Sequence, residues 1–526
     1  MQRSQALAQL AAGPFDVAVV GGGIYGVAIA WKAAASGLRV ALFERADFGS
    51  GTSSNSLRTI HGGLRYLQHV DLRRMRQSIR ARREWLREFP DYIVPVQCSI
   101  PTFGHGIFGR EVLALALLAN DVISLDRNVG VEATQRLGRG HTRGRAGAQQ
   151  LFGETAVRGY NGAALWYDGL CLNSERVLIG LLTRAMALGA VTLNHFAVER
   201  ILVTGKQVSG VVGTDALTGR AHEVRASSVV NASGPWLDDV IARSGLAYAS
   251  PLFRPSRAFN LLTRRLPFAT ALGLPVRRER SDHDAVIDRR TDTFFVMPWG
   301  QYSLIGTRHL KQRAQSGTRL IDDDEVRAFI AELNAQLGRH ALAEADVHGV
   351  FAGLLPENAA SVDQPYVTLE KNGRIIDHAA DGAQGLWSVL SVKWTTAMQT
   401  AESVVARLLA AQAAPRRALR PRSVAAGSGE IARPDERRPG SMLGQVEQAV
   451  DHEMAASLAD VVMRRTQFYL DPAFDAAALA DCAALMGRKL GWTTEQIASN
   501  MAAARTSCDQ FRWGTRANSS AGAFDR

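Results

Sequence analysis

The sequence predicts an α/β protein whose N-terminal part is a Rossmann-like domain. Three observations near the start of the chain predict it. The apolar run at residues 17–20 is typical of a buried parallel strand, and the glycine-rich turn GGGIYG follows it directly. Residues 28–35 read as a helix, and a second apolar run at 39–43 ends in Glu44. This order of strand, glycine turn, helix, strand and acid is the βαβ unit that binds dinucleotides.

Each position in this unit has a physical reason. Gly21 makes the tight turn, Gly23 lets a pyrophosphate approach the backbone, and Gly26 lets the helix pack closely on the strand. Glu44 stands 23 residues after Gly21 and can accept hydrogen bonds from ribose hydroxyls. The helix N-terminus supplies amide donors and the positive end of a dipole. We therefore expect these residues, together with Gly22, to contact the cofactor.

The next segment favours FAD over NAD. A nicotinamide enzyme would usually continue with another βα unit, whereas this chain continues with GSGTSSNSLRTIHGGLRYLQ at residues 49–68. A polar loop of small residues can donate backbone and hydroxyl hydrogen bonds to a cofactor that lies over it. Thr52, Ser53 and Ser54 are the predicted hydroxyl donors. The alternative is a solvated surface loop.

Composition limits the classes of protein. The chain has 526 residues, of which 46% are hydrophobic and 21% charged, which is typical of a globular protein of two to four domains. The longest apolar run, residues 112–119, is too short to span a membrane, and the start of the chain carries no recognisable signal sequence. Four scattered cysteines predict reduced thiols and no metal site. A cytoplasmic protein is expected.

The formal charge of +11 calls for an explanation. The arginines are scattered and no nucleic-acid module is recognisable, so nucleic acid is not expected as a partner. An anionic membrane surface or an anionic substrate would fit the excess of charge.

Several motifs occur in an order that resembles the FAD-dependent glycerol-3-phosphate dehydrogenases, within the flavoproteins similar to D-amino-acid oxidase. The resemblance covers about residues 15–505 and rests on the order of the motifs. They are GGGIYG, GTSSNS, IHGGLRYL, LWYDGLCLNSERVL, VVNASGPW, FFVMPWGQYSLIGT, SVLSVKWTTAMQTAE and VEQAVDHEMAASLADVVMRRT.

The resemblance implies a non-covalent FAD and a set of site residues. IHGGLRYL would pass beside the flavin ring, with His61, Arg65 and Tyr66 facing the substrate. Lys393, in SVKWTT, would lie near flavin N5 and the substrate. The further cofactor contacts that it implies are Gly62, Gly63, Leu64, Gly234, Lys393, Thr395 and Thr396. The first turn of a basic helix is the alternative reading of Arg65 and Tyr66, and a surface lysine that of Lys393.

The implied activity is oxidation of a secondary alcohol by hydride transfer to flavin N5. The expected reaction converts sn-glycerol 3-phosphate to dihydroxyacetone phosphate. Arg65, Tyr66 and Lys393 would hold the substrate, and His61 is the best candidate for the base. Quinone, another carrier or oxygen would reoxidise the flavin.

Departures from the family pattern leave other substrates open. An expected substrate arginine is Leu355 here, in GLLPE, and another arginine corresponds to Met398. Arg257 stands where the family has a histidine, and Arg308-His309 replaces a Thr-Asp pair. Arg257 and Arg308 would then hold the phosphate from another side. Otherwise the enzyme acts on a different alcohol, or oxidises an amine or amino acid. A flavin-free binding protein that has kept the fold is the remaining rival.

The expected organisation is a discontinuous FAD-binding domain, an α+β substrate-capping domain and a C-terminal helical domain. The FAD-binding domain would comprise residues 12–90, 166–236 and 345–410, and the capping domain 91–165 and 237–344. A linker at 411–441 leads to the helical domain at 442–526. Residues 108–125 predict an apolar helix. This helix is either part of the core of the cap or an interfacial element on the inner face of an anionic cytoplasmic membrane. A homodimer is left open.

Overall fold

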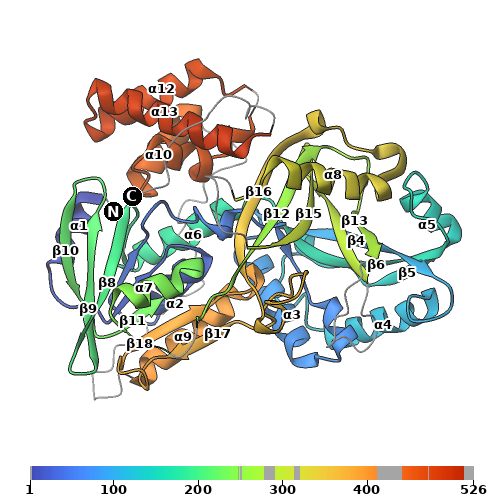
Figure 1. The fold of residues 1–526 in the computed structure, drawn as a ribbon, viewed down its shortest axis with the longest axis horizontal. Helices are drawn as coiled ribbons and strands as arrows, with labels where there is room; N and C mark the ends of the chain where they lie inside the picture. Colours follow the sequence, from blue (N-terminus) through green and yellow to red (C-terminus); the bar gives the residue numbers. More distant parts are fainter. Residues whose placement is uncertain are drawn as a thin grey trace.

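The computed structural model describes residues 3–246, 248, 251–277, 291–312, 320–411, 441–471 and 473–513. The side chain of Arg65 lies outside this description, as does nearly all of the predicted linker. Figure 1 shows three parts: a sheet covered by helices, a second large sheet, and a group of helices near the C-terminus. These parts match the predicted fold class, which is confirmed.

The first sheet is built from distant parts of the chain. Its order is β17 (Arg374–Asp377), β18 (Leu386–Leu390), β11 (Val229–Asn231), β1 (Val17–Val20), β2 (Val40–Phe43) and β7 (Val191–Leu193). All neighbours are parallel except the edge strand β17. β1 and β2 are buried along their whole length, as apolar parallel strands require. The FAD-binding fold is therefore assembled from segments that are discontinuous in sequence.

Helices and a small sheet surround this first sheet. Helix α2 (Ile24–Ala35) packs against both α6 (Ser174–Ala187) and α9 (Ala397–Ala411). The small antiparallel sheet contains β8 (Phe196–Thr204), β9 (Gln207–Asp215) and β10 (Arg220–Arg225). Helix α1 (Arg3–Leu10) packs against β7, and α7 (Leu237–Arg243) packs against β8 and β18. Helix α3 (Leu72–Glu88) contacts the segment before α9 and strands of the second large sheet.

The second large sheet contains the strands of the predicted capping domain, and we call it the cap sheet. It also includes residues 59–60, 166–171 and 347–356, which the predicted bounds place in the FAD-binding domain. Its order is β16 (Val347–Pro356), β12 (Pro255–Arg264), β15 (Tyr302–Lys311), β14 (Thr291–Trp299), β13 (Ala271–Arg277), β4 (Ile93–Phe103), β6 (Tyr160–Cys171) and β3 (Thr59–Ile60). β5 (His141–Gly144) pairs with β6, and α5 (Arg145–Phe152) lies beside it. Helix α8 (Asp323–Leu337) packs on the sheet through Phe329, whose ring centre lies 5.3 Å from that of Phe259.

The C-terminal part is helical, as predicted. It contains α10 (Met442–His452), α11 (Leu458–Asp460), α12 (Ala476–Leu490) and α13 (Thr494–Phe511). Local sequence sets the ends of these helices: Asp475 and Thr493 cap two N-termini, and Gly491 ends α12 with φ of +69°. In Figure 1 these helices, in red, lie above the FAD-binding part and reach β16 of the cap.

Helix α4 (Arg110–Ile123) corrects the interpretation of residues 108–125 as a core helix. Only Leu117 of this helix is buried. Leu115 is 67% exposed and Leu118 59% exposed, so the apolar side of α4 faces outward. No helix among the described residues is long and apolar enough to cross a membrane.

Candidate active site

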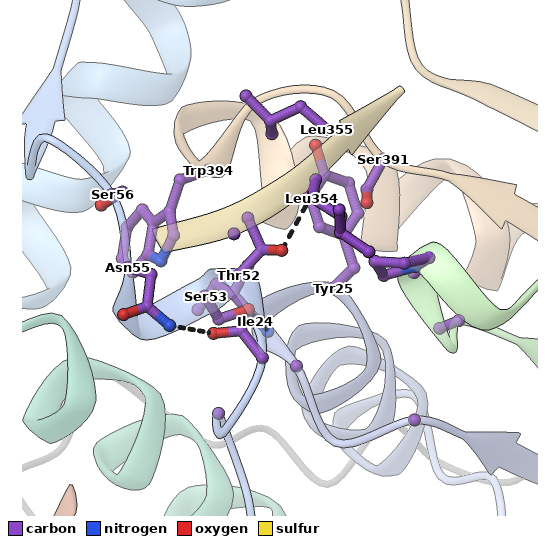
Figure 2. A pocket seen from close by; sticks show the side chains of 18 of the residues that line it. Ile24, Tyr25, Thr52, Ser53, Asn55, Ser56, Leu354, Leu355, Ser391 and Trp394 are labelled. Atoms are coloured by element: carbon purple, nitrogen blue, oxygen red, sulfur yellow. Dashed lines mark hydrogen bonds between the residues drawn. The ribbon is translucent and has the colours of Figure 1, made fainter. Parts of the chain in front are cut away.

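A cavity of about 750 Å³ lies between the two large sheets. Its wall comes from the glycine turn after β1, the loop after β2, the segment after β11, and residues 391–395 between β18 and α9. Strands β12, β15 and β16 of the cap close the other side. Figure 2 shows part of this wall, with Tyr25 from α2 and Leu355 from β16.

Backbone packing around the glycine turn explains the glycine pattern. Gly21 has φ of +103°, and a Cβ there would lie 2.6 Å from the Ala232 carbonyl oxygen. A Cβ on Gly26 would lie 1.8 Å from the Gly21 carbonyl oxygen, so only glycine lets α2 approach β1 this closely. Gly21 and Gly23 line the cavity, and Gly26 acts from behind it.

Glu44 fixes the loop that follows β2. Its carboxylate accepts hydrogen bonds from the backbone N–H of Gly22 at 2.7 Å and of Ala46 at 2.9 Å. Burial raises the pKa of Glu44, and these two amide donors partly offset that effect. Beside it, the Arg45 guanidinium lies 3.9 Å from the centre of a Trp236 ring. Glu44 therefore lines the cavity in a fixed position.

The polar loop after β2 is held by its own hydroxyls. The Ile24 N–H donates to Ser53 Oγ at 2.9 Å, so Ser53 satisfies the first amide of α2. Thr52 Oγ1 donates to the Leu354 carbonyl oxygen at 3.0 Å, as Figure 2 shows, and Ser54 Oγ donates to the Gly49 carbonyl oxygen at 2.7 Å. Thr52 and Ser53 line the cavity, whereas Ser54 does not.

The residues present fit a dinucleotide such as FAD. The turn and the start of α2 leave a bare backbone facing the cavity, and Glu44 stands at the end of β2. Trp394 also lines the cavity, and its buried indole N–H has no hydrogen-bond partner among the described protein atoms. A buried donor of this kind needs an acceptor, which a bound ligand can supply. Figure 2 shows the Trp394 ring beside Asn55 and Ser56.

Lys393 lines the cavity and contacts Tyr66, which lies behind the lining, although 327 positions separate the two residues. The Lys393 ammonium donates a short hydrogen bond to the Tyr66 hydroxyl and lies 4.4 Å from the ring centre. The Tyr25 hydroxyl donates to the Lys393 carbonyl oxygen at 2.6 Å, and Trp85 Nε1 donates to the Thr395 carbonyl oxygen at 2.8 Å. Burial raises the pKa of Tyr25, which keeps this hydroxyl protonated as a donor.

His61 also lines the cavity, with its ring centre 6.0 Å from that of Tyr66. The glycines that follow it have a packing reason. A Cβ on Gly62 would lie 2.3 Å from Arg82 Nη1, and one on Gly63 would lie 2.7 Å from the Tyr66 ring. Protein side chains therefore occupy the space that these glycines leave.

The structure does not bring every predicted cofactor residue to the cavity. Those that line it are Gly21, Gly23, Glu44, Thr52, Ser53, Gly234, Lys393 and Thr395. The others lie outside the lining: Gly22, Gly26, Ser54, Gly62, Gly63, Leu64 and Thr396. Direct contact of any of these residues with FAD stays a prediction.

The expectation that Arg257 and Arg308 hold the substrate needs correction. Arg257 makes a bidentate ion pair with Glu325 of α8 at 2.8 and 2.9 Å, and Arg308 pairs with Glu332 of α8 at 3.3 Å. Successive residues of a strand point to opposite faces of the sheet. Ala258 and Asn260 on β12, and Thr307 and His309 on β15, are the residues that line the cavity. Their arginine neighbours therefore face away from it.

Sequence reasoning missed several residues of the site. Asn260 and Trp394 line the cavity. Asp168 lies beneath the loop and accepts from the Gly62 N–H at 2.6 Å and from Trp166 Nε1 at 2.9 Å. For Trp394 the signal was its place beside Lys393, and for Asp168 its place in the LWYDG motif. Asn260 lies three positions after Arg257 on β12, so strand alternation places it on the opposite face.

Fold and cavity define a dinucleotide-binding protein with a catalytic lysine candidate. Residues 16–407 match the family described as FAD dependent oxidoreductase, and residues 381–497 match the C-terminal domain of alpha-glycerophosphate oxidase. The chain belongs to the FAD-dependent oxidoreductase family and is an enzyme whose cofactor is FAD. The predicted family, enzyme class and cofactor are therefore confirmed.

Named relatives agree with this assignment. The chain is 31% identical over 411 residues to a glycerol-3-phosphate dehydrogenase of Synechocystis sp., covering 74% of this chain and 69% of the relative. It is 30% identical to glycerol-3-phosphate dehydrogenase 2 of Mycobacterium tuberculosis, covering 75% of this chain and 63% of the relative. The structure of the Bacillus halodurans glycerol-3-phosphate dehydrogenase, complexed with FAD, superposes with a TM-score of 0.71 over 97% of both chains at 19% identity, a likeness of fold.

Proposed function

We propose that this enzyme oxidises the secondary alcohol of sn-glycerol 3-phosphate to dihydroxyacetone phosphate. The observation that carries the proposal is the contact between Lys393 and Tyr66 at the cavity wall beside His61. It places a cation and an imidazole in the cavity wall, with a phenol hydrogen-bonded to the cation. We call this part of the wall, at Lys393 and His61, the substrate end, and the part at the glycine turn and Glu44, which fits a dinucleotide, the nucleotide end. The names of the relatives support the choice of substrate.

The roles of these side chains follow from their chemistry. When bound, FAD supplies the acceptor for the two electrons that leave the alcohol carbon. The Lys393 ammonium, held by Tyr66 and by the fixed backbone at Thr395, orients the substrate hydroxyl and stabilises negative charge beside it. His61 accepts the hydroxyl proton as the carbonyl forms. Arg65 remains the predicted phosphate ligand.

Anaerobic bleaching of the flavin absorption band tests this reaction. Rapid bleaching is expected with sn-glycerol 3-phosphate and much slower bleaching with glycerol, which lacks the phosphate. A Lys393→Met variant that keeps its FAD should bleach far more slowly. A yellow enzyme that stays oxidised with sn-glycerol 3-phosphate but bleaches with an amine or an amino acid would refute the proposed substrate.

One observation supports a second element of function, attachment to a membrane surface. Fourteen large apolar side chains are markedly exposed in the described residues, and nine of them lie within residues 70–129. They are Val70, Leu72, Ile107, Val112, Leu115, Leu118, Val122, Leu125 and Val129. The α4 members are spaced at helical intervals and form one outward stripe, which we call the α4 apolar face. Such a patch usually marks an interaction surface.

An anionic bilayer is the occupant that we propose for the α4 apolar face. The exposed side chains of Arg73, Arg110 and Arg139 lie in the same region of the sequence, and the chain carries a net charge of +11. Insertion of the stripe among lipid headgroups would bury its leucines, at about 1.5–3 kcal/mol for each fully buried side chain. α4 also packs against residues 64–69, the segment of Tyr66. Membrane attachment would thus place the site close to an apolar electron acceptor such as a quinone.

Vesicle co-sedimentation tests the α4 apolar face. The native enzyme should bind vesicles of phosphatidylglycerol and phosphatidylcholine and bind neutral vesicles more weakly. Leu115→Gln with Leu118→Gln should reduce binding at least about tenfold, while Leu217→Gln, an equally simple change at an exposed leucine outside this region, should not. If the double variant instead abolishes a dimer seen by ultracentrifugation and vesicle binding is absent, the face binds a second copy.

A further inference from the structure

The C-terminal helices hold the cofactor loop through a buried charge network. Asp47 is the first fully buried carboxylate after Glu44, and its side chain is 0% exposed. Arg465, also 0% exposed, donates to both Asp47 oxygens, at 2.6 and 2.7 Å. Arg464 donates to the same carboxylate, and Asn194 donates to it at 2.9 Å. The carboxylate therefore links the loop after β2 to the segment after α11.

A second set of contacts joins the same two parts. His195 Nε2 lies 2.9 Å from an Asp460 oxygen, and Asn194 Nδ2 donates to the Met454 carbonyl oxygen at 2.9 Å. Ligand atoms of Asp47, His195 and Asp460 all lie within 4.8 Å of one another, a spacing that would allow them to coordinate a metal ion. Guanidinium groups of two arginines already neutralise these carboxylates, so we interpret the cluster as ion pairing.

Backbone hydrogen bonds connect this cluster to the cavity wall. The His195 N–H donates to the Ala46 carbonyl oxygen at 2.6 Å, and the Phe196 N–H donates to the Glu44 carbonyl oxygen at 2.8 Å. Glu44, Ala46 and Phe196 line the cavity. The residues that touch the C-terminal helices are thus the direct neighbours of residues that face the ligand.

A parallel connection runs through the first turn of α6. Glu175 forms a bidentate ion pair with Arg58, which lines the cavity, at 2.8 Å for both bonds. The next residue, Arg176, donates to Glu453 of the C-terminal part at 2.7 Å. Arg465 Nε also donates to the Glu453 carbonyl oxygen at 2.9 Å. Two separate walls of the cavity therefore depend on the segment 453–465.

We propose that the C-terminal helical part is a clamp on the FAD site, with Asp47 and Arg465 as positioning residues for the ribose-binding loop. Neither residue touches the cavity itself. Arg465 neutralises the buried Asp47, and this fixes the loop so that Glu44 meets the ribose. Loss of Arg465 would leave Asp47 buried with less compensation, and the loop would rearrange to hydrate it. Cofactor affinity should fall even though no ligand contact has been removed.

Titration of the apoenzyme with FAD, followed by quenching of tryptophan fluorescence, tests the clamp. Arg465→Met should raise the FAD dissociation constant about tenfold or more, within the usual range for coupled sites. Arg465→Lys keeps the charge but loses the bidentate geometry, so it should give a smaller rise. ADP resembles only the nucleotide half of FAD. In each variant, the affinity for ADP should fall by about the same factor as the affinity for FAD.

Arg257→Met is the matched control. Arg257 and Glu325 form a buried bidentate pair of the same type in the cap, with side chains 7% and 8% exposed. This variant should lower the melting temperature in a similar way but leave FAD affinity unchanged. If Arg465→Met does not fold, Arg464→Met provides a milder loosening, because Arg464 is 16% exposed.

The clamp is refuted if folded Arg465→Lys and Arg464→Met variants bind FAD and ADP as the native protein does while their thermal stability falls like that of the control. The ion pairs would then contribute to stability alone. Because the readout is cofactor binding, this test does not depend on the identity of the substrate.

Discussion

The two ends of the cavity are held by different kinds of contact. At the nucleotide end most contacts involve the backbone, within a span of 26 residues. Gly21 forms the tight turn, Gly26 lets α2 pack on β1, and Glu44 accepts hydrogen bonds from two backbone amides. At the substrate end the contacts join distant side chains, as with Lys393 and Tyr66. The first end therefore tolerates almost no change of shape, and the second end is open to exchange of side chains. A family can keep its cofactor and change its substrate on such a scaffold.

Gly26→Ala should have the largest effect, because it changes the nucleotide end, which tolerates almost no change of shape. The added Cβ would meet the Gly21 carbonyl oxygen at 1.8 Å, and backbone cannot move aside as a flexible side chain can. Overpacking of this kind costs about 1–3 kcal/mol or more. The purified variant should lack the flavin absorption band. Gly106→Ala is the control, since a Cβ there meets nothing within 4 Å. A yellow, stable Gly26→Ala protein would contradict the rigidity of this end.

Lys393→Met should have the second largest effect, and it changes the substrate end alone. It removes the cation that the Tyr66 hydroxyl accepts from, but it leaves the backbone bonds at Thr395 in place. We expect kcat to fall about 10²–10³-fold, the range for loss of one electrostatic stabiliser. The flavin content should stay at the native level. Loss of FAD along with activity would mean that the two ends are not independent.

The difference between the ends also explains what could be predicted from sequence. The glycine turn and Glu44 are local in sequence, so their spacing was enough to predict their place. Arg257 and Arg308 depended on which face of a strand points inward, and alternation would have shown that both cannot face the same side as Asn260 and Thr307. The clamp at Asp47 and Arg465 could not be predicted, because it joins segments more than 400 positions apart.

Hydrophobic periodicity alone also left undecided whether α4 packs in the core or presents its apolar side to an interface. An apolar stripe on a helix predicts burial against something, and the core is the usual partner. Here Leu117 turns inward while Leu115 and Leu118 remain exposed. Only the position of the helix at the rim of the cap decides between the two interpretations.

Leu355→Arg would introduce at the substrate end the cation that the family pattern predicts for this position. Leu355 lines the cavity on β16, and its neighbour Leu354 accepts from Thr52 through the backbone, so the substitution leaves that bond intact. A charged hydrogen bond contributes about 1.5–3 kcal/mol. KM for sn-glycerol 3-phosphate should therefore fall about tenfold, with no change for glycerol. An unchanged KM would place the phosphate away from Leu355.

The smallest expected effect concerns the pH dependence of stability at the contact between His195 and Asp460, where the segment before β8 meets the C-terminal helices. Burial lowers the pKa of His195, but the carboxylate of Asp460 outweighs burial, and the pKa is raised above its ordinary value. A raised pKa in the folded state means that the ion pair contributes fully below pH of about 6.5, and that its contribution is lost as pH rises through the folded-state pKa. Asp460 has a lowered pKa and loses its charge only in acid, so it does not add to this alkaline loss.

His195→Gln isolates that contribution, since glutamine can still donate to Asp460 but does not titrate. Thermal unfolding from pH 6 to pH 9 should show the native protein losing stability toward pH 9, by about 1.4 kcal/mol for each unit of pKa difference. The variant should be less stable than the native protein at pH 6 and should approach it at pH 9. Parallel curves would assign the alkaline loss to other groups. FAD affinity, measured on the same samples, should follow the stability of the native protein if His195 and Asp460 belong to the clamp.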